Sequence, residues 1–171
     1  VREALRILAA EGLVTQIPNK GAYVSQLTPA DVEEIFEMRL SLEAMALQHS
    51  IANMTDFHIR QAENVQLRLE NAHPNEYGRL NKKFHDILYA PSERKILLSH
   101  VSSLGERADR YLRMAIKELD HGMTSNEEHR QILEACKMRD SKRAIEILQS
   151  HIRDAGEMLK RYVSDLGEND K

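Results

Sequence analysis

Residues 28–47 read TPADVEEIFEMRLSLEAMAL and contain both the start signal and the periodicity of a long helix. Thr28 is a preferred N-cap residue, Pro29 suits the first helical position, and Asp31 adds an acid to the first turn. Apolar side chains then recur at helical spacing along one face. They are Val32, Ile35, Phe36, Leu42 and Ala46. The stretch predicts an amphipathic helix that ends near residue 51.

The rest of the chain continues the helical pattern. Its 171 residues include only 7 glycines and 4 prolines, and most of these lie between helical stretches. Further helices are predicted over residues 55–71, 74–89, 91–119, 125–138 and 141–166, followed by a frayed tail. Pro91 is expected to open the helix over residues 91–119, and Ser125 with Glu128 to form a capping box for the next one. The predicted fold class is therefore all-α, an antiparallel bundle of six or seven helices over residues 27–171.

The chain has a different pattern before residue 27. Residues 1–12, VREALRILAAEG, have helical spacing and end at a glycine, which suits a helix C-terminus. Residues 13–27, LVTQIPNKGAYVSQL, contain two short runs with β-branched residues around a turn. They predict a β-hairpin in which Asn19 or Gly21 has a positive φ. Residues 1–26 are expected to form a separate unit, and the chain, which starts inside a helix without Met, to be a piece of a longer protein.

Composition restricts the classes of function. Apolar residues make up 42% and charged residues 30%, which is the balance of a soluble globular protein. A single cysteine excludes an internal disulfide framework and fits the reducing cytoplasm. The sequence has neither an apolar run long enough for a transmembrane helix nor a secretory signal. A net charge of −3 names no partner, so any contact with nucleic acid would be a local patch.

Two charged residues lie on the apolar face of the helix predicted over residues 28–51. Arg39 and Glu43 fall near the middle of that stripe when each residue advances the helix by about 100°. A buried arginine needs a partner. One interpretation is an i,i+4 ion pair that braces the helix. The other is that Arg39 directs its guanidinium group into a cavity, where it can bind a carboxylate.

Polar side chains also interrupt three later apolar faces. Asn81 and His85 are one turn apart on the same face of residues 74–89, so both can address one point. His129 precedes and His151 follows the tight turn near residues 139–140 by similar distances along two antiparallel helices, which puts their imidazoles at nearly the same level. Imidazole nitrogens and an amide oxygen suit Zn²⁺, Ni²⁺, Fe²⁺ or Mn²⁺. The alternative is that each histidine is an ordinary hydrogen-bonded core residue.

Three stretches resemble the FCD effector domain of the FadR subfamily of GntR-family bacterial regulators. They are MRLSLEAMAL (residues 38–47), NKKFHDIL (residues 81–88) and EHRQILEACKMRD (residues 128–140), with His151 on the next helix. Residues 1–27 resemble the recognition helix and wing of the winged helix-turn-helix that precedes this domain in the family. The family's metal pattern is an Asp, a His four residues later, and two histidines on the last two helices. It carries over to Asn81, His85, His129 and His151, with Asn81 in place of the Asp.

The resemblance implies a cytoplasmic transcription regulator that acts as a homodimer on operator DNA, without membrane contact. Its cofactor would be a divalent metal ion, with Zn²⁺ first and Ni²⁺, Fe²⁺ or Mn²⁺ as alternatives. A small carboxylic acid effector would bind against the metal and face Arg39, with Arg110 and Tyr111 completing the pocket. Because Asn81 is uncharged, the metal keeps its full positive charge, which favours an anionic effector.

The same resemblance assigns the DNA contacts to the N-terminal unit. The residues expected to contact DNA are Arg2, Arg6, Asn19, Lys20 and Gly21. The first two helices of the DNA-binding motif are expected to precede Val1.

Three functions remain open at this point. The first is a regulator, not an enzyme, in which the acid changes operator binding. The second is a metal-dependent enzyme that acts on a small carboxylate, with the metal as Lewis acid. Against it, Glu43 is the one inward acid that is a candidate general base, and Arg39 is expected to pair with it. The third is a structural helical bundle without a ligand. Residues 1–25 favour the regulator, since a winged-helix remnant has no role in catalysis.

Overall fold

The first helix of the bundle begins at the residue that the sequence predicts. In the computed structural model, which describes residues 1–10, 12, 14–18, 20–119 and 122–169, helix α2 spans Pro29–Asn53. The hydroxyl of Thr28 accepts a hydrogen bond from the Asp31 amide at 3.1 Å, and the Asp31 carboxylate accepts one from the Thr28 amide at 2.8 Å. These bonds satisfy donors that the first helical turn leaves unpaired. Hydrogen bonds from the hydroxyl and the amide of Thr28 to the Asp31 carboxylate lower the pKa of that carboxyl group.

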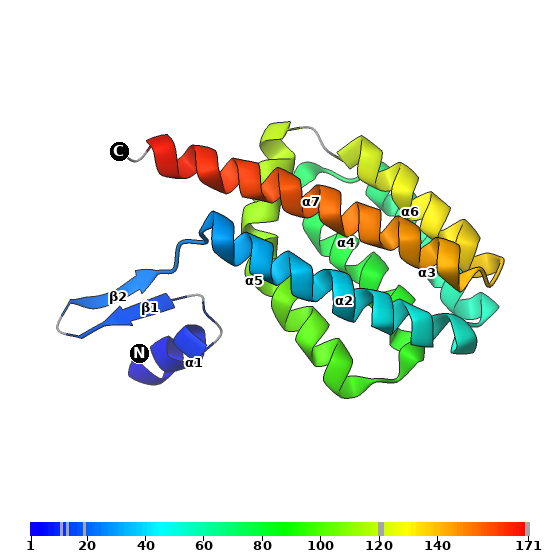
Figure 1. The fold of residues 1–171 in the computed structure, drawn as a ribbon, viewed down its shortest axis with the longest axis horizontal. Helices are drawn as coiled ribbons and strands as arrows, with labels where there is room; N and C mark the ends of the chain where they lie inside the picture. The colour runs from blue at the N-terminus through cyan, green and yellow to red at the C-terminus, as the bar shows by residue number, and fades with distance from the viewer. Residues whose placement is uncertain (11, 13, 19, 120–121, 170–171) are drawn as a thin grey trace.

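The rest of the bundle packs around α2. Its other helices are α3 (Asp56–Glu70), α4 (Pro74–Tyr89), α5 (Lys95–Leu119), α6 (Gly122–Lys137) and α7 (Ser141–Asn169). Helix α7 packs along α2 and α6, while α3 packs on α4 and α6 (Figure 1). The prediction of an all-α antiparallel bundle is confirmed. Within the described residues, no helix is both long and apolar enough to cross a membrane.

The core fills the space between these helices with side chains from the predicted apolar faces. Phe36 and Leu47 of α2, Phe84 of α4 and Leu148 of α7 are all buried in it. Gly156 of α7 lets α2 approach closely, because a Cβ atom at this position would lie 2.8 Å from the Phe36 ring. The two helices that carry Arg39 and His151 are therefore held against each other by a small residue.

The N-terminal unit is a helix followed by a hairpin, as predicted. Its elements are α1 (Arg2–Ala10), β1 (Val14–Ile17) and β2 (Gly21–Val24). The strands are antiparallel, with Val14 opposite Val24 and Ile17 opposite Gly21. Gly21 has a φ of 101°, which supplies the positive φ expected in the turn. Asn19 lies outside the described residues. Figure 1 shows this unit standing to one side of the bundle, next to the start of α2.

Three helix boundaries differ from the prediction. Helix α5 begins at Lys95 because residues 90–92 form a short 3₁₀ turn and Glu93 has a φ of 55°, which interrupts the helix after Pro91. Helix α6 begins at Gly122, so Ser125 lies inside it and is not an N-cap residue. Helix α7 continues to Asn169, beyond the predicted end at residue 166, and Gly167 lies inside the helix without ending it.

Candidate metal centre

Three helices each bring one histidine to the same place in the core. His85 comes from α4, His129 from α6 and His151 from α7, and all three side chains are buried. One ring nitrogen of each lies within 4.8 Å of those of the other two. The ring centroids are 5.1 Å apart for His85 and His129, and 4.8 Å apart for His129 and His151. The structure thus brings together the three histidines that the sequence singled out.

Two of these histidines are oriented by polar residues on neighbouring helices. The Nδ1 atom of His129 lies 3.0 Å from Oε1 of Gln66, and Nδ1 of His151 lies 2.8 Å from Oε2 of Glu128. The Gln66 amide nitrogen is within 3.2 Å of the Asn126 side-chain oxygen, which fixes the orientation of the amide group. An amide oxygen and a carboxylate can only accept, so Nδ1 of each ring carries the proton. The lone pair of each ring is then on Nε2.

The third histidine is oriented through two further buried residues. Nδ1 of His85 lies 3.1 Å from the Tyr89 hydroxyl, and this hydroxyl donates to Oε2 of Glu43 at 2.6 Å. Because the single hydroxyl proton goes to Glu43, the hydroxyl oxygen accepts from His85. His85 therefore also has its proton on Nδ1 and its lone pair on Nε2. Such outer hydrogen bonds are the usual way in which proteins orient histidine ligands of a metal.

Three polar atoms in or beside the histidine cluster are left without a partner among the described residues. They are Nε2 of His85, Nε2 of His129 and Oδ1 of Asn81, all of them buried and with no hydrogen bond to the described part of the chain. Leaving a buried polar atom unpaired costs about 1–3 kcal/mol. All three atoms carry lone pairs that a cation can share. The donor set of imidazole nitrogens and an amide oxygen fits a divalent transition metal.

Electrostatics keep these rings in the neutral form that a metal needs. Burial lowers the pKa of His85 well below its usual value, and the neighbouring His151 and Arg39 lower it further. Burial likewise lowers the pKa of His129, with additional contributions from His151 and His85. At neutral pH both imidazoles therefore have a free lone pair.

Arg39 forms the ion pair that the sequence suggested. Its Nε atom lies 2.6 Å from Oε1 of Glu43, which is only 2% exposed, whereas Arg39 itself is partly buried. Arg39 and Asn81 also border two small cavities beside the histidines. One cavity, of about 60 Å³, includes His85, and the other, of about 40 Å³, includes His151.

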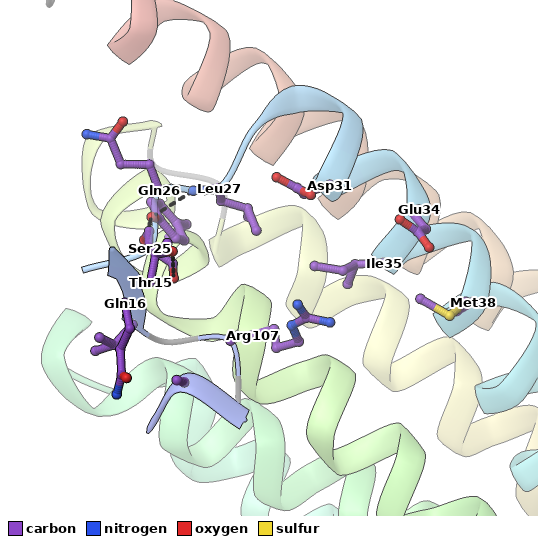
Figure 2. Close-up of a pocket in the computed structure, with 14 residues that line it drawn as sticks. Thr15, Gln16, Ser25, Gln26, Leu27, Asp31, Glu34, Ile35, Met38 and Arg107 are labelled. Atoms are coloured by element: carbon purple, nitrogen blue, oxygen red, sulfur yellow. Dashed lines mark hydrogen bonds between the residues drawn. The ribbon is translucent and has the colours of Figure 1, made fainter. Parts of the chain in front are cut away.

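Tyr111 borders a different cavity from the two that Arg39 borders. Its hydroxyl donates to the Ser25 carbonyl at 3.0 Å and accepts from the Leu27 amide at 3.0 Å. It thereby holds the linker between β2 and α2, and it borders a larger cavity of about 590 Å³. Figure 2 shows that cavity between the hairpin, the linker, α2 and α5, with Arg107 reaching from α5 toward α2. The hydrogen bonds of Tyr111 give no support to a role in the effector pocket. The side chain of Arg110 is not among those that the structure describes.

The described residues among those assigned to DNA contact lie on the surface of the N-terminal unit. Arg2 and Arg6 are exposed on α1, one turn apart, and Lys20 is exposed at the hairpin turn. Arg2, Arg6 and Gly21 border a groove of about 750 Å³ between α1 and the hairpin. Arg6 also pairs with Glu3 at 3.8 Å. The helix and the hairpin turn thus expose basic side chains from one small unit.

The residues that orient the histidines are not singled out by the sequence pattern. Gln66, Tyr89 and Glu128 come from three different helices. The available signals were weak: Gln66 is a polar residue on an apolar helix face, and Tyr89 follows His85 by one turn. Neither pattern indicates which residue of a second helix will lie opposite a histidine ring.

Comparison with known proteins gives a consistent result. Residues 34–154 match the FCD domain family. The HTH-type transcriptional regulator YdhC of Bacillus subtilis (strain 168) is 30% identical over 99% of this chain and 78% of its own length. The HTH-type transcriptional repressor GlaR of Escherichia coli (strain K12) is 27% identical over 89% of this chain and 74% of its own length.

A solved structure agrees with these relatives. The GntR-family transcriptional regulator from Pseudomonas syringae pv. tomato str. DC3000 is 29% identical and superposes with a TM-score of 0.78, covering 99% of this chain and 72% of that one. These relatives regulate transcription and are not enzymes, so the metalloenzyme alternative is rejected. The chain belongs to the GntR family of HTH-type transcription regulators and contains an FCD domain.

Proposed function

We propose that this regulator holds a divalent metal ion on Asn81, His85, His129 and His151 and binds a small carboxylic acid beside it. The observation that carries the proposal is the set of buried, unpartnered atoms on Asn81, His85 and His129, next to three histidines with engaged Nδ1 atoms. A bound ion would supply the partner that each of these atoms needs, and Zn²⁺ is the first choice for three imidazoles. Ni²⁺, Fe²⁺ and Mn²⁺ accept the same donors.

The acid is proposed to bind between the metal and Arg39. All four proposed ligands are uncharged, so the ion keeps its double positive charge and attracts an anion. Nε of Arg39 is bonded to Glu43, which leaves the two terminal nitrogens of the guanidinium group for a carboxylate. Cavities of about 60 and 40 Å³ have room for a few non-hydrogen atoms, so the acid is small.

The acid acts by changing operator binding. Regulators of this family bind operator DNA. We assign this contact to the unit of residues 1–26, through Arg2, Arg6, Asn19, Lys20 and Gly21, and effector binding to residues 27–171. In a homodimer, an acid that binds more tightly to one arrangement of the two DNA-binding units shifts the population toward it.

Thermal melting tests metal and acid binding separately. Chelator-treated protein is melted alone, with Zn²⁺, and with Zn²⁺ plus acetate, lactate, malonate or succinate. We expect Zn²⁺ to raise the melting temperature and one or more acids to raise it further, because ligands that bind only the folded state stabilise it. His129→Ala should lose the response to Zn²⁺, whereas His100→Ala, at an exposed position of α5, should keep it.

The variant Arg39→Lys distinguishes binding of the acid from binding of the metal. Lysine keeps the charge but cannot present two parallel donors, so this variant should respond to Zn²⁺ and lose most of its response to acid. Parent protein whose melting temperature responds to neither Zn²⁺ nor acid would show that the helical domain of this regulator binds neither ligand.

A further inference from the structure

We infer, on the basis of the proposed function, that Glu43 and Tyr89 are positioning residues that join the effector arginine Arg39 to the metal ligand His85. The four side chains form one hydrogen-bonded chain across two helices. Arg39 and Glu43 are one turn apart on α2, and His85 and Tyr89 are one turn apart on α4. Each helix thus contributes an i,i+4 pair, and the two pairs meet at the Glu43 carboxylate.

The hydrogen bonds of this four-residue chain are short, and Glu43, Tyr89 and His85 are buried. Oε1 of Glu43 accepts from Nε of Arg39 at 2.6 Å, and Oε2 of the same carboxylate accepts from the Tyr89 hydroxyl at 2.6 Å. Nδ1 of His85 lies 3.1 Å from that hydroxyl. Tyr89 is 1% and His85 6% exposed. Water therefore cannot easily replace a missing member, and each hydrogen bond is stronger than it would be in solvent.

The direction of each hydrogen bond in this four-residue chain determines which ring nitrogen of His85 carries the proton. The guanidinium group only donates, the carboxylate only accepts, and the tyrosine hydroxyl has one proton, which goes to the carboxylate. Nδ1 of His85 is left as the donor to the hydroxyl oxygen. This keeps the proton on Nδ1 and exposes the Nε2 lone pair, which has no partner among the described residues. Without the hydroxyl, the proton is free to move to Nε2 and block the lone pair.

The other end of the chain positions Arg39. Glu43 holds the guanidinium group by Nε, which leaves N–H groups of the two terminal nitrogens for another acceptor. Glu43 is therefore expected to affect both ligands, because it contacts the arginine and the tyrosine. Tyr89 is expected to affect chiefly the metal, because its hydroxyl contacts the histidine.

The first measurement uses metal alone. Zn²⁺ affinity is determined by competition with a chelating dye for the parent, Tyr89→Phe, Glu43→Gln and Tyr23→Phe. Tyr23 is the control, since its hydroxyl bonds the Lys20 carbonyl within the hairpin and none of the three histidines. We expect Tyr89→Phe to weaken Zn²⁺ binding by about ten- to a hundred-fold, the usual effect of losing such an outer hydrogen bond, with Tyr23→Phe near the parent. Glu43→Gln should weaken Zn²⁺ binding and also reduce the melting response to acid.

The second measurement needs no metal. Two-bond ¹H–¹⁵N correlations assign the proton-bearing nitrogen of each histidine ring in the metal-free protein. We expect His85 to carry its proton on Nδ1 in the parent and on Nε2 in Tyr89→Phe. If Tyr89 had only a structural role, its replacement would not change the position of this proton, so an unchanged tautomer in the folded variant overturns the inference. Zn²⁺ binding by Tyr89→Phe that is as tight as in the parent also overturns it. A parent that binds no Zn²⁺ overturns the proposed function, and the tautomer of His85 then decides the inference separately.

Discussion

Nδ1 of His151 on α7 lies 2.8 Å from a carboxylate oxygen of Glu128 on α6, although 23 residues separate them in sequence. Glu128 also borders the cavity that contains Arg39 and Asn81. The carboxylate fixes the ring orientation, and its charge makes the opposite nitrogen a better donor to a cation. The helix hairpin formed by α6 and α7 thus carries two proposed ligands, His129 and His151, together with the acid that orients one of them.

Removing the Glu128 carboxylate should weaken the metal site. Glu128→Ala is expected to lower Zn²⁺ affinity by about ten- to a hundred-fold, because the His151 ring loses its acceptor. Competition with a chelating dye measures the effect. Glu134→Ala is the matched control, since Glu134 is an exposed acid of the same helix that pairs with Lys137. Equal Zn²⁺ affinities in the two variants would contradict a positioning role for Glu128.

A negative charge among the proposed metal-ligating residues should have opposite effects on the binding of the metal and on the binding of the acid. In Asn81→Asp a carboxylate replaces the amide oxygen, so Zn²⁺ binding should become tighter. The acid should bind more weakly, because the extra negative charge removes part of the field that attracts it. Calorimetric titration with Zn²⁺, and then with the acid that raises the melting temperature most, measures both. Asn64→Asp adds the same charge at an exposed position of α3 and should change neither.

The sequence could predict those features that depend on local contacts. The capping of α2 by Thr28 and Asp31 and the shared face of Asn81 and His85 both follow from residues three or four apart. The hydrogen bond between His129 and Gln66 joins residues 63 apart, and that between Tyr89 and Glu43 joins residues 46 apart. Such pairs depend on how the helices are rotated against each other, which periodicity does not specify.

The helix boundaries are least predictable from the sequence where the backbone leaves its preferred conformation. Glu93 adopts a φ of 55°, which side chains other than glycine rarely do, and no residue pattern marks it. Tyr111 illustrates the same limit for a site residue. It follows the apolar face of α5, but its hydroxyl bonds a linker residue 86 positions earlier in the chain.

The single cysteine should be unreactive in the folded protein. Cys136 is fully buried, and burial raises the pKa of its thiol to about 12. Only the thiolate reacts with iodoacetamide, so at pH 8 about one thiol in ten thousand is reactive even before access is considered. Alkylation followed by mass spectrometry should show rapid labelling in urea and almost none in buffer. Raising the pH from 7 to 9 should increase the small rate in buffer, because more thiolate forms. Labelling in buffer as rapid as in urea would show that α6 opens readily.

The linker between the DNA-binding unit and the bundle should loosen when Tyr111 loses its hydroxyl. This hydroxyl accepts from the Leu27 amide and donates to the Ser25 carbonyl, so it ties α5 to the segment where β2 gives way to α2. Tyr111→Phe removes both bonds and keeps the ring. Loss of about 1 kcal/mol per hydrogen bond, about 2 kcal/mol for both, predicts a roughly thirtyfold faster amide exchange at Leu27, since opening of the linker becomes correspondingly easier. Hydrogen–deuterium exchange of peptides covering residues 24–31 measures it. Tyr23→Phe is the matched control, because the Tyr23 hydroxyl bonds the Lys20 carbonyl within the hairpin.

If α5 transmits the state of the effector cavity to this linker, Tyr111→Phe should also weaken the effect of the acid on operator binding. Unchanged exchange at Leu27 would show that other contacts hold the linker, and Tyr111 would then have no part in that transmission.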